Sequence, residues 1–251
     1  MDLIQLHEPF EEPEESYGLL QAMLERTAAS GRGAALIFPS SRHIGVTRPD
    51  TRNPDFGEAV AVAEGLGFQV LMRRSGGGVV AADPGTLTLA VYEPVADLRH
   101  GIYERYGAAT DLVVAALERV GVRSEAGEVA AEFCPGAYSV RSGGYNGMKL
   151  AGLSQRVTRR AARLDALVMA EPAPELSDAL ESFYGALKTP FRRGSVGSLA
   201  AAGSTGGVKE LADALEEEAR ERYGASESVL TDEVRRAARS LIGEYRIREV
   251  G

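Results

Sequence analysis

The stretch Arg73-Arg74-Ser75-Gly76-Gly77-Gly78 separates two apolar segments that have the composition of β-strands. Three successive glycines leave their backbone N–H groups unshielded, so a carbonyl, carboxylate or phosphate group can approach them closely. The two arginines add positive charge at the same place. The stretch is therefore compatible with a ligand-binding loop and, equally, with a wide turn that requires positive φ angles.

Around this loop, the spacing of apolar residues alternates between the helix and strand periods. A helix predicted over 14–29 has two acidic residues in its first turn and Gly31 as its stop. A second helix is predicted from Asn53-Pro54, a capping residue followed by a first-turn proline, to Ala63. The remaining predicted elements are a helix over 102–120, ended by Gly121, and strands over 34–38, 69–73, 86–92 and 164–170.

The sequence Glu171-Pro172-Ala173-Pro174 interrupts this alternation and marks the clearest boundary in the chain. We predict an α+β fold in which a mixed β-sheet packed with helices forms a body over residues 1–170. A helical C-terminal portion over 171–251 is expected to pack on the same domain. It should contain three helices, the last two with apolar faces within 208–219 and 234–245. The order of the strands does not follow from the sequence.

The composition is that of an ordinary globular protein, since 44% of the 251 residues are apolar and 25% are charged. No apolar run approaches the ~20 residues of a membrane span, and Met1-Asp2-Leu3-Ile4 does not resemble the start of a signal peptide. The single cysteine, Cys134, excludes an intrachain disulfide and any paired-cysteine zinc or redox site. The formal charge of −8 disfavours a nucleic-acid binder. We therefore expect a cytoplasmic protein that binds neither membranes nor nucleic acid.

Several common catalytic signatures are missing from the sequence. It contains no P-loop, no HExxH, no GxSxG and no GxGxxG that opens a helix. The three histidines, His7, His43 and His100, are scattered along the chain. Neither a metal site nor a Ser-His-Asp triad is therefore predicted.

Cys134 lies in the stretch 132–140, directly before Pro135-Gly136. The proline biases Cys134 toward an extended conformation, and the Pro-Gly pair predicts a turn. A strand end before a turn is a common place for a nucleophile. A lone cysteine is, however, more often a small buried apolar residue, and both interpretations stay open.

Lys149 is surrounded by small and apolar residues in the stretch 147–156 (GMKLAGLSQR). Leu150 and Ala151 predict a strand that carries the ammonium group into a pocket, where burial would lower its pKa and allow proton transfer near neutrality. Beside a thiol, the positive charge would favour the thiolate. The alternative is an ordinary surface lysine at a strand end.

Together, these three stretches resemble the lipoate–protein ligase/octanoyltransferase family, which is related to biotin protein ligase. Residues 73–78 are similar to its RRxSGGG loop, with one residue fewer before the serine. Residues 132–140 resemble the cysteine segment of one branch, the enzymes that move octanoyl groups from the glycine cleavage H protein to other proteins. Lys149 falls in a segment similar to GxK(I/V/L)xGxxQ(R/K), with Gly147, Gly152, Gln155 and Arg156 in place.

Two departures from the family pattern separate its branches. The ATP-dependent ligases usually carry a histidine where this chain has Ala82, and a basic residue where it has Met148. Cys134 is instead what an acyltransferase of the cysteine–lysine type requires. The resemblance thus implies an acyltransferase- or ligase-like catalytic body with the biotin/lipoyl ligase fold over residues 1–170.

The resemblance implies transfer of an octanoyl or lipoyl group onto the acceptor lysine of lipoyl domains. Cys134 would hold the acyl chain as a thioester, and Lys149 would act as acid and base. No ATP, metal or organic cofactor is needed on such a path. Glycine cleavage H protein or an acyl carrier protein would serve as the donor. The residues implied in substrate binding are Arg73, Arg74, Ser75, Gly76, Gly77, Gly78, Asp83, Gly85, Gly152 and Gln155.

Two other functions fit the same motifs. An ATP-dependent lipoate–protein ligase would use Lys149 at an acyl-adenylate and leave Cys134 without a role. A non-catalytic relative would bind an acyl group without turnover. These alternatives differ from the acyltransferase in whether ATP is consumed and whether an acyl group moves.

An acidic chain that docks acidic lipoyl domains needs a local basic patch. A cluster of arginines follows the lysine segment and is a candidate for this patch, unless it forms only a solvated surface. The candidates are Arg156, Arg159, Arg160 and Arg163, with Arg192 and Arg193 further along the chain.

Overall fold

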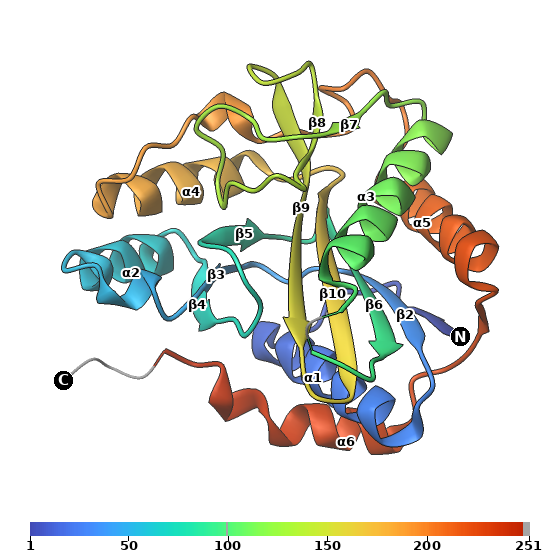
Figure 1. Cartoon of the computed structure of the whole chain (residues 1–251). Coiled ribbons are helices and arrows are strands. Elements are labelled where there is room, and N and C mark those ends of the chain that lie inside the picture. Colours follow the sequence, from blue (N-terminus) through green and yellow to red (C-terminus); the bar gives the residue numbers. More distant parts are fainter. Residues whose placement is uncertain (99, 248–251) are drawn as a thin grey trace.

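The computed structural model describes residues 1–98 and 100–247, which form an α+β fold with a larger and a smaller β-sheet (Figure 1). The larger sheet has the order β11-β1-β2-β6-β10-β9-β8-β7, and the smaller has the order β4-β3-β5. The strands are β1 (Asp2–Gln5), β2 (Ala34–Pro39), β3 (His43–Val46), β4 (Gln69–Met72), β5 (Val80–Ala82), β6 (Thr86–Pro94), β7 (Glu125–Ala126), β8 (Val140–Ser142), β9 (Met148–Val157), β10 (Ala161–Met169) and β11 (Ser226–Glu227). The helices are α1 (Pro13–Ser30), α2 (Phe56–Gly65), α3 (Ile102–Arg119), α4 (Pro174–Ala186), α5 (Val208–Tyr223) and α6 (Asp232–Ser240).

The centre of the larger sheet is an antiparallel ladder of its longest strands. β10 pairs with β6 on one side and with β9 on the other. β2 continues the sheet beyond β6, and β1 joins β2 in parallel. β11, from the C-terminal part of the chain, then pairs in parallel with β1. The sheet therefore combines segments from both halves of the sequence.

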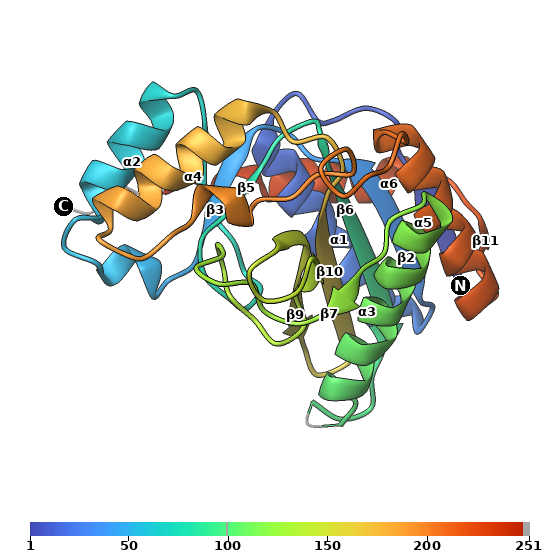
Figure 2. The ribbon, with the colours of Figure 1, turned by 90° about the horizontal axis from the view of Figure 1, so that it is seen from above.

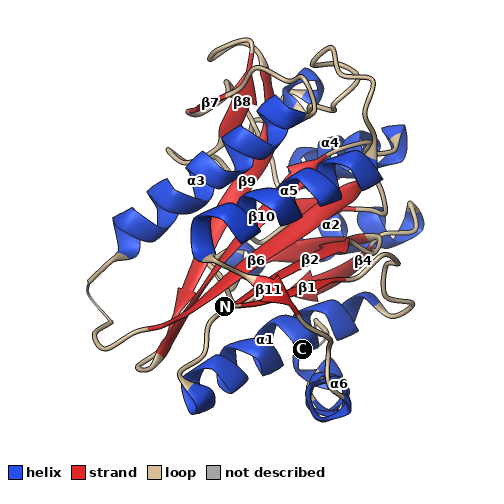
Figure 3. Cartoon of the chain, turned by 90° about the vertical axis from the view of Figure 1, so that its right-hand side faces the viewer, coloured by secondary structure: helices blue, strands red, loops and turns tan. Residues whose placement is uncertain are grey.

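Helices cover both faces of the larger sheet (Figure 3). Alternate residues of a strand point to opposite faces, and β2 shows the result. Ala35 and Ile37 enter a core with α3 and α5, whereas Leu36 and Phe38 enter a second core with α1 and α6. The sheet is thus buried on both sides, which explains why β2 reads as a continuous apolar run.

The smaller sheet has a core of its own, covered by α2 and α4, which lie side by side (Figure 2). Ile44 and Val70 from the sheet pack in this core with Phe56 from α2 and Phe183 from α4. The two phenylalanine rings meet edge to face, with centroids 6.3 Å apart. Because α4 follows β10 directly, it ties the smaller sheet to the larger one.

Local sequence signals set the ends of the first helix. α1 begins with Pro13, carries Glu14 and Glu15 in its first turn, and stops at Gly31. Gly31 has a φ of 67° and donates its N–H to the carbonyl of Thr27, a left-handed C-cap that glycine adopts at no steric cost. These ends confirm the predicted helix over 14–29.

Two features within the smaller-sheet region differ from what the sequence suggested: the start of the second helix, and one of the two interpretations of the glycine loop, a wide hairpin turn between neighbouring strands. The second helix starts at Phe56, because the Asn53 side chain accepts a hydrogen bond from the Asp55 N–H at the end of a short 3-10 turn and so lies outside the helix. The loop over residues 73–79 is not a hairpin turn. It leads from β4 into β5, and these strands lie on opposite sides of β3.

Three helices follow residue 171, as predicted, and they contribute to three different cores. The last of them is shorter than its apolar spacing predicts, because α6 ends at Ser240 and Tyr245 lies beyond it. The division of the chain at residue 170 stays a prediction. Among the described residues, no helix combines the length and apolar character required to cross a membrane.

Candidate active site

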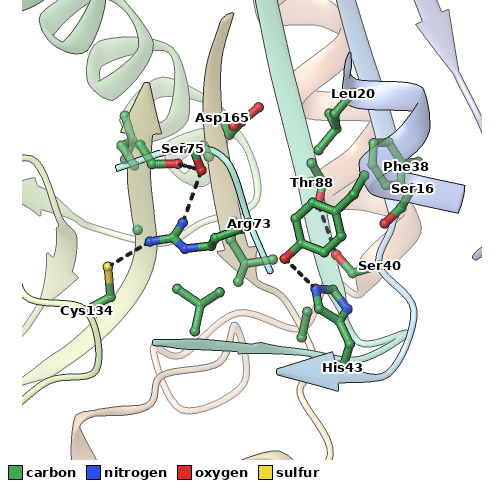
Figure 4. A pocket seen from close by; sticks show the side chains of 18 of the residues that line it. Ser16, Leu20, Phe38, Ser40, His43, Arg73, Ser75, Thr88, Cys134 and Asp165 are labelled. Carbon is green, nitrogen blue, oxygen red and sulfur yellow. Dashed lines mark hydrogen bonds between the residues drawn. The ribbon is translucent and has the colours of Figure 1, made fainter. Parts of the chain in front are cut away.

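A mainly apolar cavity of about 70 Å³ lies between α1, the centre of the larger sheet and the first strand of the smaller sheet. Polar side chains gather at two sides of this cavity (Figure 4). Cys134, Arg73 and Ser75 lie at one side, and His43 and Ser40 lie at the other. The apolar lining is formed by Tyr17, Leu20, Phe38, Val80, Ala82, Phe133, Leu153, Ala166 and Leu167.

The Cys134 thiol is free and accepts two hydrogen bonds from the glycine-rich loop. The donors are the Gly78 N–H, 3.1 Å from Sγ, and Arg73 Nη2, 3.4 Å from Sγ. The φ of Cys134 is +43°, so the extended conformation expected from Pro135 is wrong. Tertiary hydrogen bonds to both its N–H and its carbonyl hold the strained turn in place, at a cost of about 1–3 kcal/mol.

Gly77 explains why the loop must be glycine where it meets the thiol. Its φ is 94°, and a Cβ on it would lie 2.5 Å from Cys134 Sγ and 2.6 Å from Arg73 Nη2. Arg73 itself is only 8% exposed and also donates to the carbonyls of Gly76 (2.6 Å) and Gly78 (2.9 Å). The loop therefore wraps around the guanidinium group and presents one of its backbone N–H groups to the sulfur.

Lys149 is completely buried on β9, on the other side of the cysteine turn. Its Nζ donates to the carbonyls of Phe133 and Cys134, each at 2.9 Å, and forms an ion pair with Glu132 Oε2 at 3.3 Å. Burial lowers the pKa of Lys149, while the Glu132 carboxylate opposes that shift. In the described part of the chain, the ammonium thus contacts the backbone of the cysteine turn and a buried carboxylate, rather than the thiol itself.

Gly152 lies between the Lys149 ammonium and the cavity. It lines the cavity, and a Cβ on it would lie 3.0 Å from Lys149 Cε and 3.3 Å from Nζ. The main chain of Lys149 is also held, because its carbonyl accepts a hydrogen bond from the Gly197 N–H at 2.9 Å. The predicted strand that carries the lysine into the interior is confirmed. Lys149 does not itself line the cavity, but its amine lies against Gly152, which does.

Two site residues were not predicted from the sequence. Tyr184 of α4 accepts a hydrogen bond from the Cys134 N–H at 2.8 Å and donates one to the Val79 carbonyl at 3.0 Å, so it ties the cysteine turn to the glycine loop. Glu132 is 2% exposed and lies between Lys149 and Ser139. Glu132 could have been suspected from the sequence, because it lies only two residues before Cys134. Tyr184 lies 50 residues further along the chain, and no sequence pattern near it indicated a role in the site.

A model of the lipoyl protein ligase A/B catalytic domain matches residues 51–220, which is more than half of the chain. The chain belongs to this family. It is 37% identical over 110 residues to the octanoyl-[GcvH]:protein N-octanoyltransferase of Geobacillus kaustophilus, a match that covers 44% of this chain and 38% of that relative. It is 35% identical over 141 residues to the protein of the same name from Bacillus velezensis, covering 55% of this chain and 47% of the relative. Each match spans less than half of the relative's length.

The fold agrees with this family assignment. The crystal structure of a lipoate-protein ligase A bound with ATP superimposes with a TM-score of 0.77 over 97% of this chain and 94% of that one. The sequence identity is only 18%, so this likeness concerns the fold alone. The predicted α+β fold of the biotin/lipoyl ligase type is thereby confirmed.

Of the predicted site residues, Arg73, Ser75, Cys134 and Gly152 line the cavity, whereas Asp83 and Gly85 are among those that do not. Asp83 is 1% exposed and accepts hydrogen bonds from the Gly85 N–H (2.9 Å) and the Ala173 N–H (2.8 Å), and burial raises its pKa. A Cβ on Gly85 would lie 1.9 Å from the carbonyl oxygen of Glu171. Both residues therefore join the turn between β5 and β6 to the segment that leads into α4.

Gln155 also has a supporting position. Its side-chain oxygen accepts from Arg105 Nε at 2.7 Å, and its amide donates to the Ile102 carbonyl at 3.2 Å. Its own carbonyl accepts the Gly76 N–H at 3.4 Å. In this lipoyl ligase-like chain, Gln155 thus holds the start of α3 and the glycine loop together, and Ser75 bonds in a similar way to Ser154 at 3.0 Å.

A basic cleft of about 530 Å³ adjoins the cavity at Arg73 and Ser75, which line both. Arg74 lies in this cleft, where it pairs with Glu244 and stacks on Tyr245 with 4.9 Å from its Cζ to the ring centroid. The cleft is lined by Thr47, Arg48, Pro49, Met72, Arg73, Arg74, Ser75, Arg156 and Glu244, so it holds four arginines and one acidic side chain.

The arginines considered for docking do not form one surface. Arg163 is only 3% exposed and pairs with Asp165, so its assignment to a docking patch is wrong. Arg192 donates to the carbonyls of Ala130 and Gly147. The remaining members are separated: Arg193 pairs with Asp178 and Glu181, Arg156 faces the basic cleft, and Arg159 and Arg160 lie beside α1 in a different groove.

The side of the cavity opposite Cys134 holds a buried hydrogen-bonded pair. His43 Nδ1 donates to the Ser41 carbonyl at 2.8 Å, because a carbonyl can only accept, and Nε2 therefore accepts from the Tyr17 hydroxyl at 3.0 Å. Burial lowers the pKa of His43 to about 4 and raises that of Tyr17 to about 12. Both groups are thus neutral at pH 7. Over residues 1–98 and 100–247, no three His, Cys, Asp or Glu side chains are placed to hold a metal ion.

We expect Tyr184→Phe to lower the free energy of unfolding by about 1–3 kcal/mol, because it removes both hydrogen bonds that tie the cysteine turn to the glycine loop. Amide exchange at Cys134 should accelerate more than exchange elsewhere. Urea unfolding and hydrogen exchange measure the two effects. Tyr223→Phe is the control, since the Tyr223 hydroxyl has no hydrogen bond within the described residues, and it should change stability by less than ~0.5 kcal/mol. Equal effects of the two changes would contradict the assignment.

The buried His43 predicts a pH dependence of stability. The unfolded chain binds a proton on this histidine below about pH 6.5, whereas the folded chain does so only near pH 4. Stability should therefore be complete above pH 6.5 and fall by up to about 3 kcal/mol as the pH drops toward 4. His43→Gln should flatten this part of the urea-unfolding profile, whereas substitution of the exposed His7 should leave it unchanged.

Proposed function

We propose that this protein transfers an octanoyl or lipoyl group onto the acceptor lysine of lipoyl domains, through a thioester on Cys134. One observation carries the proposal. The single thiol lies at an apolar cavity, receives hydrogen bonds from the glycine loop, and shares its turn with a buried lysine. The names of the relatives, which refer to octanoyl transfer from GcvH, support the same activity.

In the first step, the Cys134 thiolate attacks the carbonyl carbon of the donor amide, and the new C–S bond precedes cleavage of the C–N bond. Gly78 N–H and Arg73 donate hydrogen bonds to this sulfur. Of the three glycine N–H groups, that of Gly76 donates to the Gln155 carbonyl and that of Gly78 donates to the thiol. The Gly77 N–H has no partner among the described residues and is the proposed donor to the substrate oxygen. One such donor is worth about 3–4 kcal/mol in the transition state.

An amine leaves from the donor in this step and must be protonated as it departs. Lys149 is the proposed source of this proton, because its amine lies against Gly152, a residue of the cavity wall that carries no side chain. In the second step, the acceptor lysine attacks the thioester, the C–S bond breaks, and Lys149 takes up a proton from the new amide nitrogen. The thiolate and the ammonium are thereby restored, and no cofactor is consumed.

The cavity supplies the affinity for the acyl chain. Each buried CH₂ contributes roughly 0.8 kcal/mol. The donor is proposed to be octanoylated H protein, with an octanoyl acyl carrier protein as a further candidate and the cytoplasm as the location.

We expect that incubating the protein with octanoylated H protein and an apo lipoyl domain moves one octanoyl mass onto the acceptor, with a transient adduct on the Cys134 peptide. Cys134→Ala should reduce transfer by about 10³-fold or more. Intact-mass and peptide spectra measure both. Acceptor modification only with free octanoate and ATP would instead indicate an ATP-dependent ligase, and binding without turnover would indicate a non-catalytic relative.

The basic cleft supports docking of an acidic acceptor domain next to the reactive side of the cavity. Opposite charges that remain at the rim of an interface mainly accelerate association. Arg48 lines this cleft and is exposed, so it can meet a partner without rearrangement.

We expect Arg48→Glu to raise the KM for the lipoyl domain by about 5-fold, corresponding to roughly 1 kcal/mol, and to weaken the salt dependence of transfer. Steady-state kinetics at two ionic strengths measure this. Arg159→Glu is the matched control, since Arg159 is exposed beside α1 and not in the cleft. The opposite result, with only Arg159→Glu altering KM, would place docking at the β9–β10 turn.

A further inference from the structure

We propose that Glu132 is a positioning residue that acts through Lys149: it keeps the buried ammonium protonated, so that Lys149 can serve as the acid for an amine leaving group. This inference rests on the proposed acyl transfer and names the group that sets the protonation state of its acid. It predicts a dependence on the leaving group that a purely structural glutamate would not produce.

The burial of both partners is the first argument. The side chains of Lys149 and Glu132 are 0% exposed, and Nζ lies 3.3 Å from Oε2. An ammonium without water needs a counter-charge, or it loses its proton. Beyond this ion pair, Oε2 has no hydrogen-bond partner among the described residues, so this oxygen is available to face the lysine.

The surrounding charges single out Glu132. The charged and titratable groups that act on the ammonium are Glu132 and Cys134 from the cysteine turn and Arg73 from the end of β4. Arg73 opposes a second positive charge, and Cys134 is neutral once it carries an acyl group. Glu132 is therefore the counter-charge that persists through the reaction cycle.

The second carboxylate oxygen shows how Glu132 is held. Oε1 accepts hydrogen bonds from Ser139 Oγ at 2.9 Å and from the Gly136 N–H at 3.3 Å. Both donors lie after Cys134 in the same turn, so the carboxylate closes this turn around the nucleophile. Oε1 thus supports the turn, while Oε2 supplies the charge for the lysine.

The chemistry separates these two roles. An amide donor releases an amine, which needs a proton from Lys149, whereas an aryl ester such as p-nitrophenyl octanoate releases a phenolate, which does not. Attack by the Cys134 sulfur forms the same thioester from either donor. Loss of the counter-charge should therefore impair the amide reaction selectively, and loss of the turn should impair both reactions.

The test compares wild type and Glu132→Gln, which preserves the shape of the side chain and removes its charge. With octanoylated H protein as donor, we expect the alkaline limb of the pH–rate profile to move to lower pH and the rate at pH 8 to fall by about 10–100-fold. With p-nitrophenyl octanoate, the burst that reports acylation of Cys134 should stay within about 3-fold of wild type. Ser139→Ala is the control, because it removes a hydrogen bond of the turn and leaves the charge in place.

Each outcome has a distinct meaning. Equal losses with both donors, or an alkaline limb that does not move, would overturn the role of Glu132. Failure of wild type to acylate Cys134 with either donor would instead overturn the proposed function. If Glu132→Gln does not fold, Glu132→Asp is the second variant, because it retains the charge but moves it one methylene away from Lys149. It should shift the alkaline limb of the pH–rate profile in the same direction by a smaller amount. An unchanged alkaline limb would again contradict the proposal.

Discussion

The contact between the glycine loop and the Cys134 thiol is the constraint on which the rest of this site depends. A Cβ at Gly77 would lie too close to both Cys134 Sγ (2.5 Å) and Arg73 Nη2 (2.6 Å). Glycine therefore permits an N–H group, a guanidinium group and a sulfur atom to meet within hydrogen-bonding distance. Since these groups come from segments that are remote in the chain, both sheets and α4 must be in place before the contact can exist.

Buried charges surround this contact, and each has a specific partner. Arg73 is held by main-chain carbonyls of the loop, Lys149 by Glu132 and the cysteine turn, and Arg163 by Asp165. Burial of such ions is expensive, and removal of one partner costs several kcal/mol. Each of these ions is therefore held in place beside the Cys134 turn, next to a cavity that is mainly apolar.

The residues of the family pattern divide into two groups in the structure. Arg73, Ser75, Cys134 and Gly152 line the cavity, with Lys149 directly behind Gly152. Asp83, Gly85 and Gln155 support the loops from a distance, through hydrogen bonds and close packing. A motif in the sequence therefore mixes groups that can touch a substrate with groups that hold the loops in shape, and only their contacts distinguish the two.

Short-range patterns in the sequence predicted the longer helices and several of the buried strands, and they singled out Cys134 and Lys149 as candidate site residues. The acidic first turn and glycine stop of α1, the buried strands and the lysine between small residues all follow from rules that act within a few positions. Tertiary structure decided the rest. The strand order, the left-handed turn at Cys134, the Tyr184 bridge and the separation of the arginines depend on contacts between remote segments, whose geometry arises only when the sheets pack against their helices.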